Sequence, residues 1–198
     1  MKKIISLYQR NYETDRLVRD EVVPGAEWVL AGEGVATRKY DGTCCLVNDG
    51  RLYKRYDAKK GKTPPASFVP AQPEPDPISG HWPGWLPVGD GPEDQHHREA
   101  WTAEGRCPLA DGTYELCGPK VQGNAEWLCE HLLIPHGCDL LPDVPRDYAG
   151  IKAYLAEHDI EGIVWWRNND GGCYSDENTD CDMVKIKAKD FGIERGGR

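Results

Sequence analysis

Alternating apolar and polar residues in the first third of the chain predict a series of β-strands. Asn48-Asp49-Gly50 favours a tight hairpin, because Asp-Gly supplies the positive φ angles that such a turn needs. In the strand that returns from this turn, alternation places Leu52 and Lys54 on one face and Arg55 on the other. Strands rich in β-branched and aromatic residues are expected over residues 27–31, 35–39, 43–47 and 51–56.

The second half of the chain combines further strand patterns with one clear helix. Residues 147–158 predict that helix, with Asp147 as its N-cap and Ile151, Tyr154 and Leu155 as its apolar stripe. Residues 168–182 are expected to form an acidic, solvated loop. Strands are expected over residues 113–117, 131–135, 160–166 and 183–188. Because no strand–helix–strand rhythm is present, the pattern predicts an α+β fold with antiparallel sheets flanked by helices.

Residues 63–92 interrupt this pattern with nine of the fifteen prolines. Proline lacks a backbone N–H and restricts φ, so we expect neither a helix nor an inner strand in this excursion. Residues 81–88 are too aromatic for a disordered linker. They are expected to pack on the domain or to line a site.

Length and charge limit the classes of protein that the chain can belong to. A chain of 198 residues is long enough for one domain, expected over residues 1–198, with a buried core. Its net charge of −9 argues against a protein that coats nucleic acid with a uniformly basic surface. The charges are segregated, since residues 50–62 hold six basic side chains against one acidic, and residues 71–115 hold nine acidic against two basic. A local basic strip on an acidic body suits a cleft that handles phosphate.

No apolar run approaches the length that a bilayer requires, and the apolar start of the chain ends too early for a signal peptide. We therefore expect a cytoplasmic protein without a membrane partner, whose eight cysteines are reduced thiols. Zinc would accept Cys129, His131, His136 and Cys138 as ligands, but their spacing matches no familiar chelating turn. A strand between them would hold the side chains apart, so ordinary thiols and imidazoles are favoured.

A set of charged residues carries the functional argument. Lys39-Tyr40-Asp41-Gly42 is a weak motif alone, but it is followed in order by Arg55, Glu115, Glu161 and the alternating pair Lys185 and Lys187. A lysine acts as a nucleophile when its amine is neutral, and neighbouring cations favour that form. Lys185 and Lys187 project from one face of a strand toward the same anion. Carboxylates suit a hard metal or a ribose. The set therefore indicates phosphoryl or nucleotidyl transfer.

In this order the motifs resemble those of the lysine nucleotidyltransferases, the superfamily of ATP-dependent DNA and RNA ligases and mRNA-capping enzymes. Four strings more closely resemble the 5′-to-3′ RNA ligase 1 family of animals and its microbial and viral relatives, and the likeness spans about residues 30–193. They are Lys39-Tyr40-Asp41-Gly42-Thr43-Cys44-Cys45, residues 80–88, Leu132-Leu133-Ile134-Pro135-His136-Gly137 and Ile160-Glu161-Gly162-Ile163-Val164-Trp165. The resemblance implies a nucleotidyltransferase (ligase adenylation) fold without an appended OB domain.

The resemblance also implies roles for the residues of the set. Lys39 would attack the α-phosphate of ATP and form lysyl-AMP, which adenylylates an RNA 5′-phosphate before a 3′-hydroxyl seals the ends. Lys185 and Lys187 would be the other catalytic residues, and Glu161 would hold Mg²⁺ or Mn²⁺. Glu115 would bind either the ribose or the metal, and Arg55 either the nucleotide or the RNA 5′-phosphate. The full set of nucleotide-binding residues that the resemblance implies is Arg38, Asp41, Gly42, Arg55, Glu115 and His136.

Two departures from the family pattern leave adenine recognition open. Many RNA ligases have a glutamate directly before the nucleophile, where this sequence has Arg38. No aromatic side chain is obvious for stacking on the base, and His136 is the candidate. Alternatives are a DNA nick ligase or GTP-dependent capping type of nucleotidyltransferase, and a non-catalytic module that binds RNA ends. No obligate protein partner is inferred.

Overall fold

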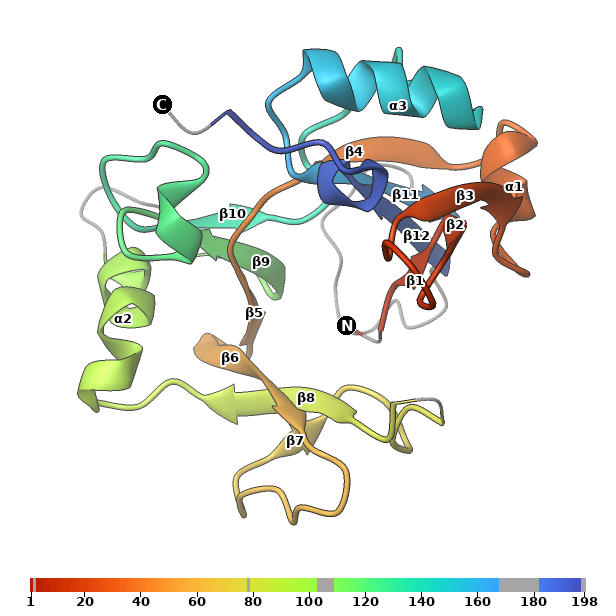
Figure 1. Ribbon diagram of the computed structural model, residues 1–198. Helices are drawn as coiled ribbons and strands as arrows, with labels where there is room; N and C mark the ends of the chain where they lie inside the picture. The colour runs from red at the N-terminus through yellow and green to blue at the C-terminus, as the bar shows by residue number, and fades with distance from the viewer. Residues whose placement is uncertain (2, 78, 103–108, 168–181, 197–198) are drawn as a thin grey trace. The chain divides into compact units, whose positions relative to one another are not determined.

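The computed structural model describes residues 1–198 apart from 2, 78, 103–108, 168–181 and 197–198 (Figure 1). The expected acidic loop lies outside the described residues, except for Asp182. The chain divides into two compact units. The first unit contains Met1–Lys3 and Asp41–His136, and the second contains Ile4–Tyr40 and residues 137–167 and 182–196. The expectation of one nucleotidyltransferase domain stays a prediction.

The first unit is built on a six-stranded antiparallel sheet of order β10-β9-β5-β6-β8-β7. The hairpin expected at Asn48-Asp49-Gly50 is confirmed, because Asp49 and Gly50 have φ angles of 50° and 65° and join β5 to β6. The strands are β5 (Thr43–Asn48), β6 (Arg51–Ala58), β7 (Val69–Pro70), β8 (Trp82–Pro87), β9 (Gly112–Cys117) and β10 (Leu132–Pro135).

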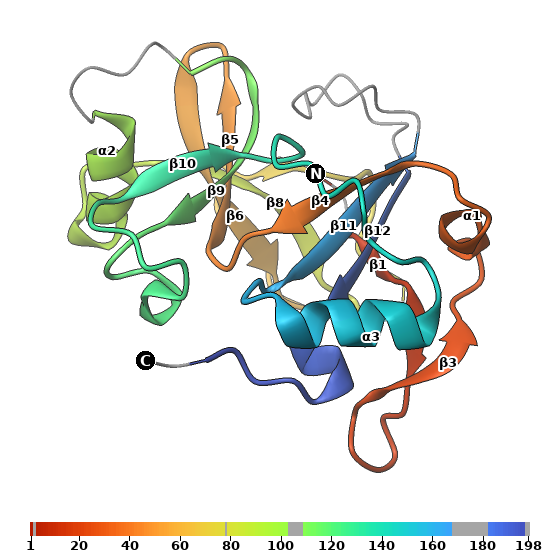
Figure 2. The same cartoon turned by 90° about the horizontal axis from the view of Figure 1, so that it is seen from above.

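An apolar core covers one face of this sheet. Helix α2 (Gln95–Trp101), which follows the 3₁₀ turn η1 (Pro92–Asp94), lies beside β10 (Figure 2). Its Ala100 packs into this core. A second 3₁₀ turn, η2 (Gln122–Asn124), lies between β9 and β10. The buried members of the core are Cys45, Val47, Leu52, Ala100, Tyr114, Leu116, Val121 and Leu133.

The expectation that the proline-rich residues 63–92 contain no inner strand is wrong. β8 is an inner strand, between β6 and β7, although it contains Pro83 and Pro87. Its residues Gly84 and Trp85 pair with Pro70 and Val69 of β7, and the Pro83 carbonyl still accepts a hydrogen bond from the Ala71 N–H. Proline therefore removes a donor without preventing pairing. Trp85 is fully buried, which confirms that the aromatic cluster packs on the fold.

The second unit holds a four-stranded sheet of order β1-β12-β11-β4 and a separate hairpin, β2 with β3. β1 is parallel to β12, and the other pairs are antiparallel. The strands are β1 (Ile5–Ser6), β2 (Tyr8–Arg10), β3 (Val18–Val22), β4 (Val35–Lys39), β11 (Gly162–Arg167) and β12 (Asp182–Lys187).

Helix α3 (Tyr148–Glu157) covers one face of the four-stranded sheet (Figure 1). Asp147 caps it as expected, because its side chain accepts the Gly150 N–H at 2.9 Å. Ile151 and Leu155 are fully buried against the sheet residues Ile163, Trp165, Val184 and Ile186. The 3₁₀ turn η3 (Ala188–Phe191) follows β12 and packs Phe191 into the same core.

The strand expected over residues 27–31 is wrong, because this segment forms the short helix α1 (Glu27–Leu30). The neighbouring residues Trp28 and Val29 are both buried in the core. Consecutive side chains on a strand point to opposite faces, so a strand at this edge would expose one of them. Burial of both outweighs the β-propensity of the segment.

The antiparallel sheets with few helices confirm the α+β class, with the parallel pair β1–β12 as an exception. Within the described parts of the chain, no helix combines the length and the apolar character that crossing a membrane requires.

Candidate functional site

Three of the expected charged residues meet at one end of the four-stranded sheet in the second unit. Lys39 ends β4 and Lys187 ends β12, and both are register partners of Gly162, the first residue of β11. Glu161 directly precedes Gly162. The strand register therefore brings a lysine from each side to this carboxylate.

Glu161 binds both lysines. Its Oε2 lies 2.5 Å from the Lys39 Nζ, and its Oε1 is paired with the Lys187 Nζ. The Glu161 side chain is 8% exposed, whereas the two lysines are 18% and 20% exposed. Burial opposes ionisation of Glu161, but the charges of Lys39 and Lys187 outweigh it and lower the pKa of this carboxyl. The carboxylate is therefore held ionised between two cations.

Lys185 adds a third cation to this group. Lys185 and Lys187 alternate with the core residues Val184 and Ile186, so both lysines lie on the sheet face away from α3, as the spacing predicted. Burial, followed by the charges of Lys187 and Lys39, lowers the pKa of Lys185 from 10.5 to about 8. Lys185 therefore loses its charge more easily than an ordinary lysine.

Backbone contacts fix the ends of these strands. A Cβ on Gly162 would lie 2.1 Å from the Ile186 carbonyl oxygen, so only glycine allows β11 and β12 to approach this closely. The buried Asp190 accepts the Lys187 N–H at 3.0 Å and pairs with Arg10. Sequence reasoning missed Asp190, although its place three residues after Lys187 is the spacing of a capping box.

Arg38 lies beside the nucleophile candidate on the opposite face of β4, because consecutive strand residues alternate. Its guanidinium carbon is 4.6 Å from the centre of the Tyr40 ring. The Tyr40 hydroxyl donates to Asp139 at 2.9 Å, and burial together with this bond raises the pKa of Tyr40. Arg38 is therefore packed against an aromatic ring that is itself held in place.

The rest of the first motif belongs to the first unit. The Asp41 N–H donates to the Glu126 carboxylate at 2.9 Å, and the Asp41 carbonyl accepts from the Cys117 thiol at 3.9 Å. A Cβ on Gly42 would lie 2.2 Å from the Leu116 carbonyl oxygen. The glycine of the motif is thus required by a close strand contact, which motif spacing alone did not reveal.

Arg55 lies on β6 with its guanidinium held from several sides. It donates to the Met1 carbonyl at 2.6 Å and pairs with Asp57 at 2.9 Å, and it lies over the ring of Trp85. A cavity of about 120 Å³ is lined by Arg55 together with Lys3 and His81. Basic and acidic side chains therefore line this small cavity together, because Asp57 and Asp76 also lie in its wall and Asp76 pairs with Lys3.

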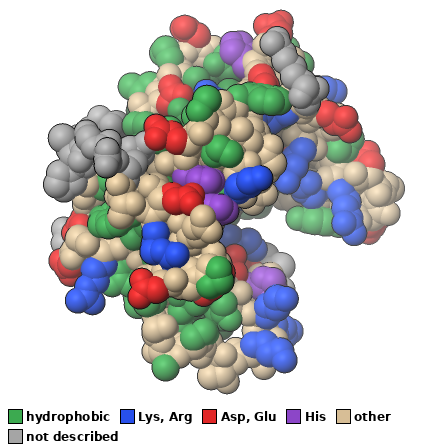
Figure 3. Space-filling view, turned by 90° about the vertical axis from the view of Figure 1, so that its left-hand side faces the viewer, with side chains coloured by type: hydrophobic (Ala, Val, Ile, Leu, Met, Phe, Trp, Pro, Cys, Tyr) green, Lys and Arg blue, Asp and Glu red, His purple; other side chains and the backbone are tan. Residues whose placement is uncertain are grey.

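The basic strip expected over residues 50–62 needs correction at Lys54. Its Nζ lies 2.5 Å from the buried Asp94, whose other oxygen accepts the Gly89 N–H. Burial opposes the ionised form of Asp94, but Lys54 and this N–H keep the pKa of Asp94 below its usual value. Lys54 thus neutralises a core carboxylate instead of facing a ligand. Figure 3 shows basic side chains interspersed with acidic ones and histidines on the face that it presents.

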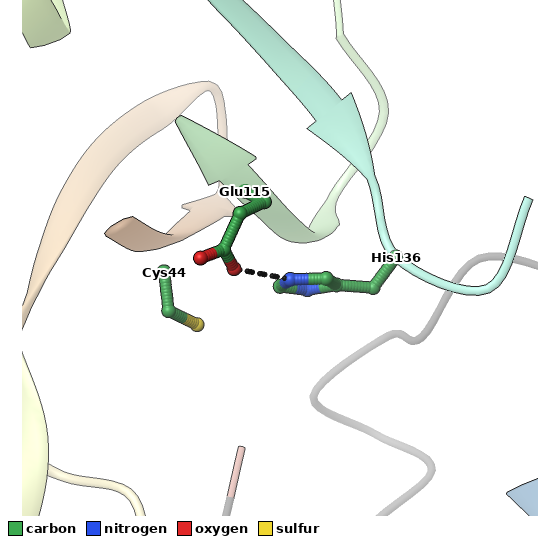
Figure 4. A group of neighbouring side chains, drawn as sticks. All are labelled: Cys44, Glu115 and His136. Carbon is green, nitrogen blue, oxygen red and sulfur yellow. Dashed lines mark hydrogen bonds and ion pairs between the residues drawn. The ribbon is translucent and has the colours of Figure 1, made fainter. Parts of the chain in front are cut away.

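Glu115 and His136 are brought together in the first unit, with Cys44 beside them (Figure 4). Glu115 Oε2 lies 2.8 Å from His136 Nε2, and the other ring nitrogen lies 3.0 Å from the Thr113 hydroxyl. Alternation from the core residues of β5, β6 and β9 places Cys44, Arg55 and Glu115 on the sheet face away from the apolar core. Sequence reasoning missed Cys44 and Thr113, because their positions depend on the register between distant strands.

The two expected metal ligands differ in how well they fit Mg²⁺ or Mn²⁺. Mg²⁺ is usually held by one or two carboxylates together with substrate phosphates, and the buried Glu161 provides one such carboxylate between Lys39 and Lys187. Glu115 is shared with an imidazole and faces a thiol, donors that hard cations do not favour. Glu161 therefore fits the expected metal, and Glu115 fits it less well.

The thiols and imidazoles around β10 do not converge on one point. In the described residues, His136 groups with Cys44 and Glu115, whereas His131 groups with His96 and Glu99. Cys129 and Cys138 are exposed thiols at opposite ends of the segment that contains β10. The intervening strand separates the four side chains, as the sequence predicted.

Comparison with known proteins gives one relevant similarity. No model of a known protein family matches the chain. The chain is similar to RNA ligase 1 of Pongo abelii, with 26% identity in an alignment that covers 66% of this chain. The chain spans 62% of the length of that curated relative.

Proposed function

We propose that the chain is an ATP-dependent RNA ligase, which joins RNA 3′-hydroxyl and 5′-phosphate ends through lysyl-AMP and adenylylated RNA. The distant similarity to a protein named RNA ligase 1 supports RNA ligation as the general activity. The motifs from Lys39 to Lys187 support the finer assignment to covalent lysine nucleotidyl transfer. The proposed nucleotidyltransferase fold agrees with the α+β class.

The cluster of Lys39, Glu161, Lys185 and Lys187 is the observation that carries the proposal. It gathers three lysines and one buried carboxylate on the same sheet face. Such a site has excess positive charge in a partly dehydrated setting, where an anion is stabilised more strongly than in water. The α-phosphate of a nucleotide is an anion that suits this charge, and negative charge that builds on it during transfer is stabilised by preorganised cations.

Lys39 is the proposed nucleophile of the first step. Its ammonium first loses a proton, and the amine lone pair forms an N–P bond with the α-phosphorus of ATP. The bond from that phosphorus to the bridging oxygen breaks, pyrophosphate leaves, and the nitrogen releases its second proton to solvent. Lys185 and Lys187 remain outside the covalent change and neutralise the phosphate oxygens.

Glu161 links nucleophile activation to metal binding. Mg²⁺ or Mn²⁺, when bound, would add positive charge at the transferring phosphate. Glu161 would hold this cation, and in the structure the same carboxylate pairs with the Lys39 ammonium. One residue is thus proposed to serve both the metal and the nucleophile.

The remaining two steps return the enzyme to its starting state. An oxygen of the RNA 5′-phosphate attacks the phosphorus of lysyl-AMP, the N–P bond breaks, and the electron pair returns to the Lys39 nitrogen, which takes up two protons and becomes an ammonium again. The RNA 3′-hydroxyl oxygen then attacks the activated 5′-phosphorus and releases its proton to solvent, and AMP leaves. Arg55 is proposed to bind the nucleotide or the RNA 5′-phosphate, through a guanidinium that offers paired donors.

Five further residues are proposed to bind nucleotide. Glu115 would contact the ribose or a metal, and His136 would lie against the base. Asp41 and Gly42 complete the motif around the nucleophile, and Arg38 takes the position of the glutamate that helps to read adenine in many RNA ligases. These assignments come from the resemblance, residue by residue.

The first test is the intact mass of the protein after incubation with ATP and Mg²⁺. Wild type is expected to gain one adenylyl group, and Lys39→Ala to gain none. Lys187→Ala is expected to slow adduct formation by about 100-fold, because one phosphate-neutralising charge is lost. Lys152→Ala, which removes an exposed lysine of α3 in the same unit, serves as the matched control and should behave as wild type.

Parallel reactions separate the alternatives. GTP in place of ATP tests a capping type, and nicked DNA beside single-stranded RNA tests a DNA ligase. A starting mass that already includes AMP would show that the purified protein is pre-adenylylated. Failure of every nucleotide to label a folded, initially unmodified protein would overturn the enzyme assignment and leave an RNA-end-binding module.

A further inference from the structure

The group of Cys44, Glu115 and His136 offers a chemistry that the proposed ligase reaction does not use. Cys44 on β5 and Glu115 on β9 are direct register partners of neighbouring antiparallel strands. His136 follows β10, the strand on the other side of β9, and its N–H donates to the Thr113 carbonyl at 3.1 Å. Three adjacent strands of one sheet therefore position the three side chains, so little conformational freedom is lost when they bind one ligand.

The donor atoms already lie near the separation that a single metal ion needs. The Cys44 sulfur, a Glu115 oxygen and a His136 ring nitrogen are all within 4.8 Å of one another. Ligands of tetrahedral zinc are about 3 to 4 Å apart, given zinc–ligand bonds of about 2.0 to 2.3 Å. The bond from His136 Nδ1 to the Thr113 hydroxyl at 3.0 Å fixes the ring with Nε2 toward Glu115. Such a partner on the outer nitrogen is typical of metal-bound histidines.

The donor set selects the kind of metal. Thiolate and imidazole favour borderline-soft cations such as Zn²⁺, whereas Mg²⁺ and Ca²⁺ favour oxygen ligands alone. The neighbouring Cys45 points into the core, where burial raises the pKa of its thiol, so it does not compete for the ion. We propose that Cys44, Glu115 and His136 bind Zn²⁺, with a fourth position open to water. The Cys44 thiol releases its proton to solvent when its sulfur binds the ion.

A second cluster in the same unit provides an internal comparison. His96 and Glu99 of α2 lie with His131, and Glu99 is within 3.1 Å of both imidazoles. The two rings are stacked with centres 4.3 Å apart, and Glu99 is exposed. This cluster has no thiol and stands on a seven-residue helix, so a metal bound there lacks the sulfur signature expected for Cys44.

Cobalt titration of the full chain under reducing conditions tests the proposal, because Co²⁺ replaces Zn²⁺ and reports its ligands. Wild type is expected to bind one Co²⁺ with an intense near-ultraviolet thiolate-to-cobalt band that Zn²⁺ abolishes. Cys44→Ser and Cys44→Ala should lose the band and weaken zinc binding by at least about 100-fold, and Thr113→Val by about 10-fold. Cys129→Ser, at an exposed thiol, is the matched control and should keep the band.

The outcomes decide where a metal binds. A band that persists in both folded Cys44 variants, or no band in wild type, overturns the site. Cobalt binding that lacks the band and is lost in His96→Ala and His131→Ala would assign the metal to the second cluster instead. Circular dichroism of each variant confirms that it is folded before its spectrum is interpreted.

One consequence rests on the proposed function. Zn²⁺ would engage Glu115 and His136, which are proposed to bind nucleotide, so zinc should inhibit lysyl-AMP formation in wild type and much less in Cys44→Ser. Each protein is compared with and without zinc, so a slower variant does not affect the ratio. Cobalt binding with the band but without inhibition would overturn the nucleotide roles and leave the metal site standing. Absence of any adenylylation would overturn the proposed function, while the spectrum still decides the site.

Discussion

Both units place candidate functional side chains on the sheet face turned away from their own core, but they assemble these side chains differently. In the second unit, Lys39 and Lys187 reach Glu161 from the ends of strands on either side of it. In the first unit, Cys44 and Glu115 meet as cross-strand partners, and His136 joins them from the end of the next strand. One cluster is held by opposite charges, and the other is held largely by strand geometry and hydrogen bonds.

This difference predicts different sensitivities. A buried carboxylate between cations is costly to neutralise, since its removal leaves like charges together without a counter-ion. A carboxylate that accepts one hydrogen bond from an imidazole loses far less when an amide replaces it. The two glutamates therefore allow the same substitution to be compared in two settings.

The largest expected effect belongs to Glu161→Gln. It should lower the free energy of unfolding at neutral pH by about 3 kcal/mol, an upper figure because both lysines are partly exposed. The folded-state pKa of Glu161 lies below 4.5, so its contribution is complete above that pH and is lost as the pH falls through the folded value. Urea unfolding at several pH values measures this, with the exposed Glu157→Gln of α3 as control. A penalty that persists after full acidification would contradict the ion-pair explanation.

The next largest effect is expected from alanine substitution of the two glycines that closely approach a neighbouring strand. These variants test whether a local change destabilises only its own unit. Gly162→Ala and Gly42→Ala each drive a Cβ to within 2.1 or 2.2 Å of a carbonyl oxygen, which should cost about 2 to 3 kcal/mol. Hydrogen exchange should show faster opening of β11 and β12 in the first variant and of β9 in the second. Equal loss of protection throughout the chain in both variants would show that the units unfold as one.

Lys185 should make the free energy of unfolding rise with pH between about pH 8 and pH 10.5. Its pKa is about 8 in the folded protein and 10.5 ordinarily, so the folded state holds fewer protons than the unfolded state between these values. The cost of burying the charged form is complete below pH 8 and is relieved as the pH rises, by about 2 kcal/mol after allowance for solvent screening. Unfolding of wild type and Lys185→Met from pH 7 to 10.5 checks this, and a parallel pH dependence in both would refute it.

Glu115→Gln is expected to have the smallest effect, a loss of about 1 kcal/mol, because the amide oxygen can still accept a hydrogen bond from His136. Urea unfolding beside Glu161→Gln makes the comparison direct. Equal losses from the two substitutions would contradict the distinction between a charge-held and a geometry-held cluster.

Local signals in the sequence predicted much of the fold. The Asp49-Gly50 turn, the Asp147 cap and the alternation around Lys185 and Lys187 each depend on residues close in the chain. The predictions of a strand at Trp28 and of no inner strand in the segment that forms β8 were wrong for one reason. Tertiary burial and sheet pairing outweighed local propensity in both segments. The short strands β1 to β3 and helix α2 were not foreseen, because two to seven residues carry little periodicity.

For the candidate site, the sequence predicted which residue types occur and their order along the chain, but not which of them touch. Motif order suggested that Lys39, Glu161 and Lys187 belong together, and the register of three strands brings them into contact. The sequence did not reveal that Lys54 turns to Asp94, or that Cys44 lies opposite Glu115. Such contacts join segments 40 or more residues apart, and they depend on register, which no local pattern encodes.

The strand that carries Lys185 and Lys187 owes its protected position to a very short neighbour. β12 is covered on its outer side by β1, Ile5–Ser6, and by the hydrogen bond from the Leu7 N–H to the Lys185 carbonyl at 2.8 Å. Deleting residues 1–10 would turn β12 into an open sheet edge, which can accept a strand from another copy of the chain. Such a truncated protein would form strand-swapped or aggregated species, so any loss of the proposed activity would report self-association together with the missing contacts of Met1 to Arg55 and of Arg10 to Asp190.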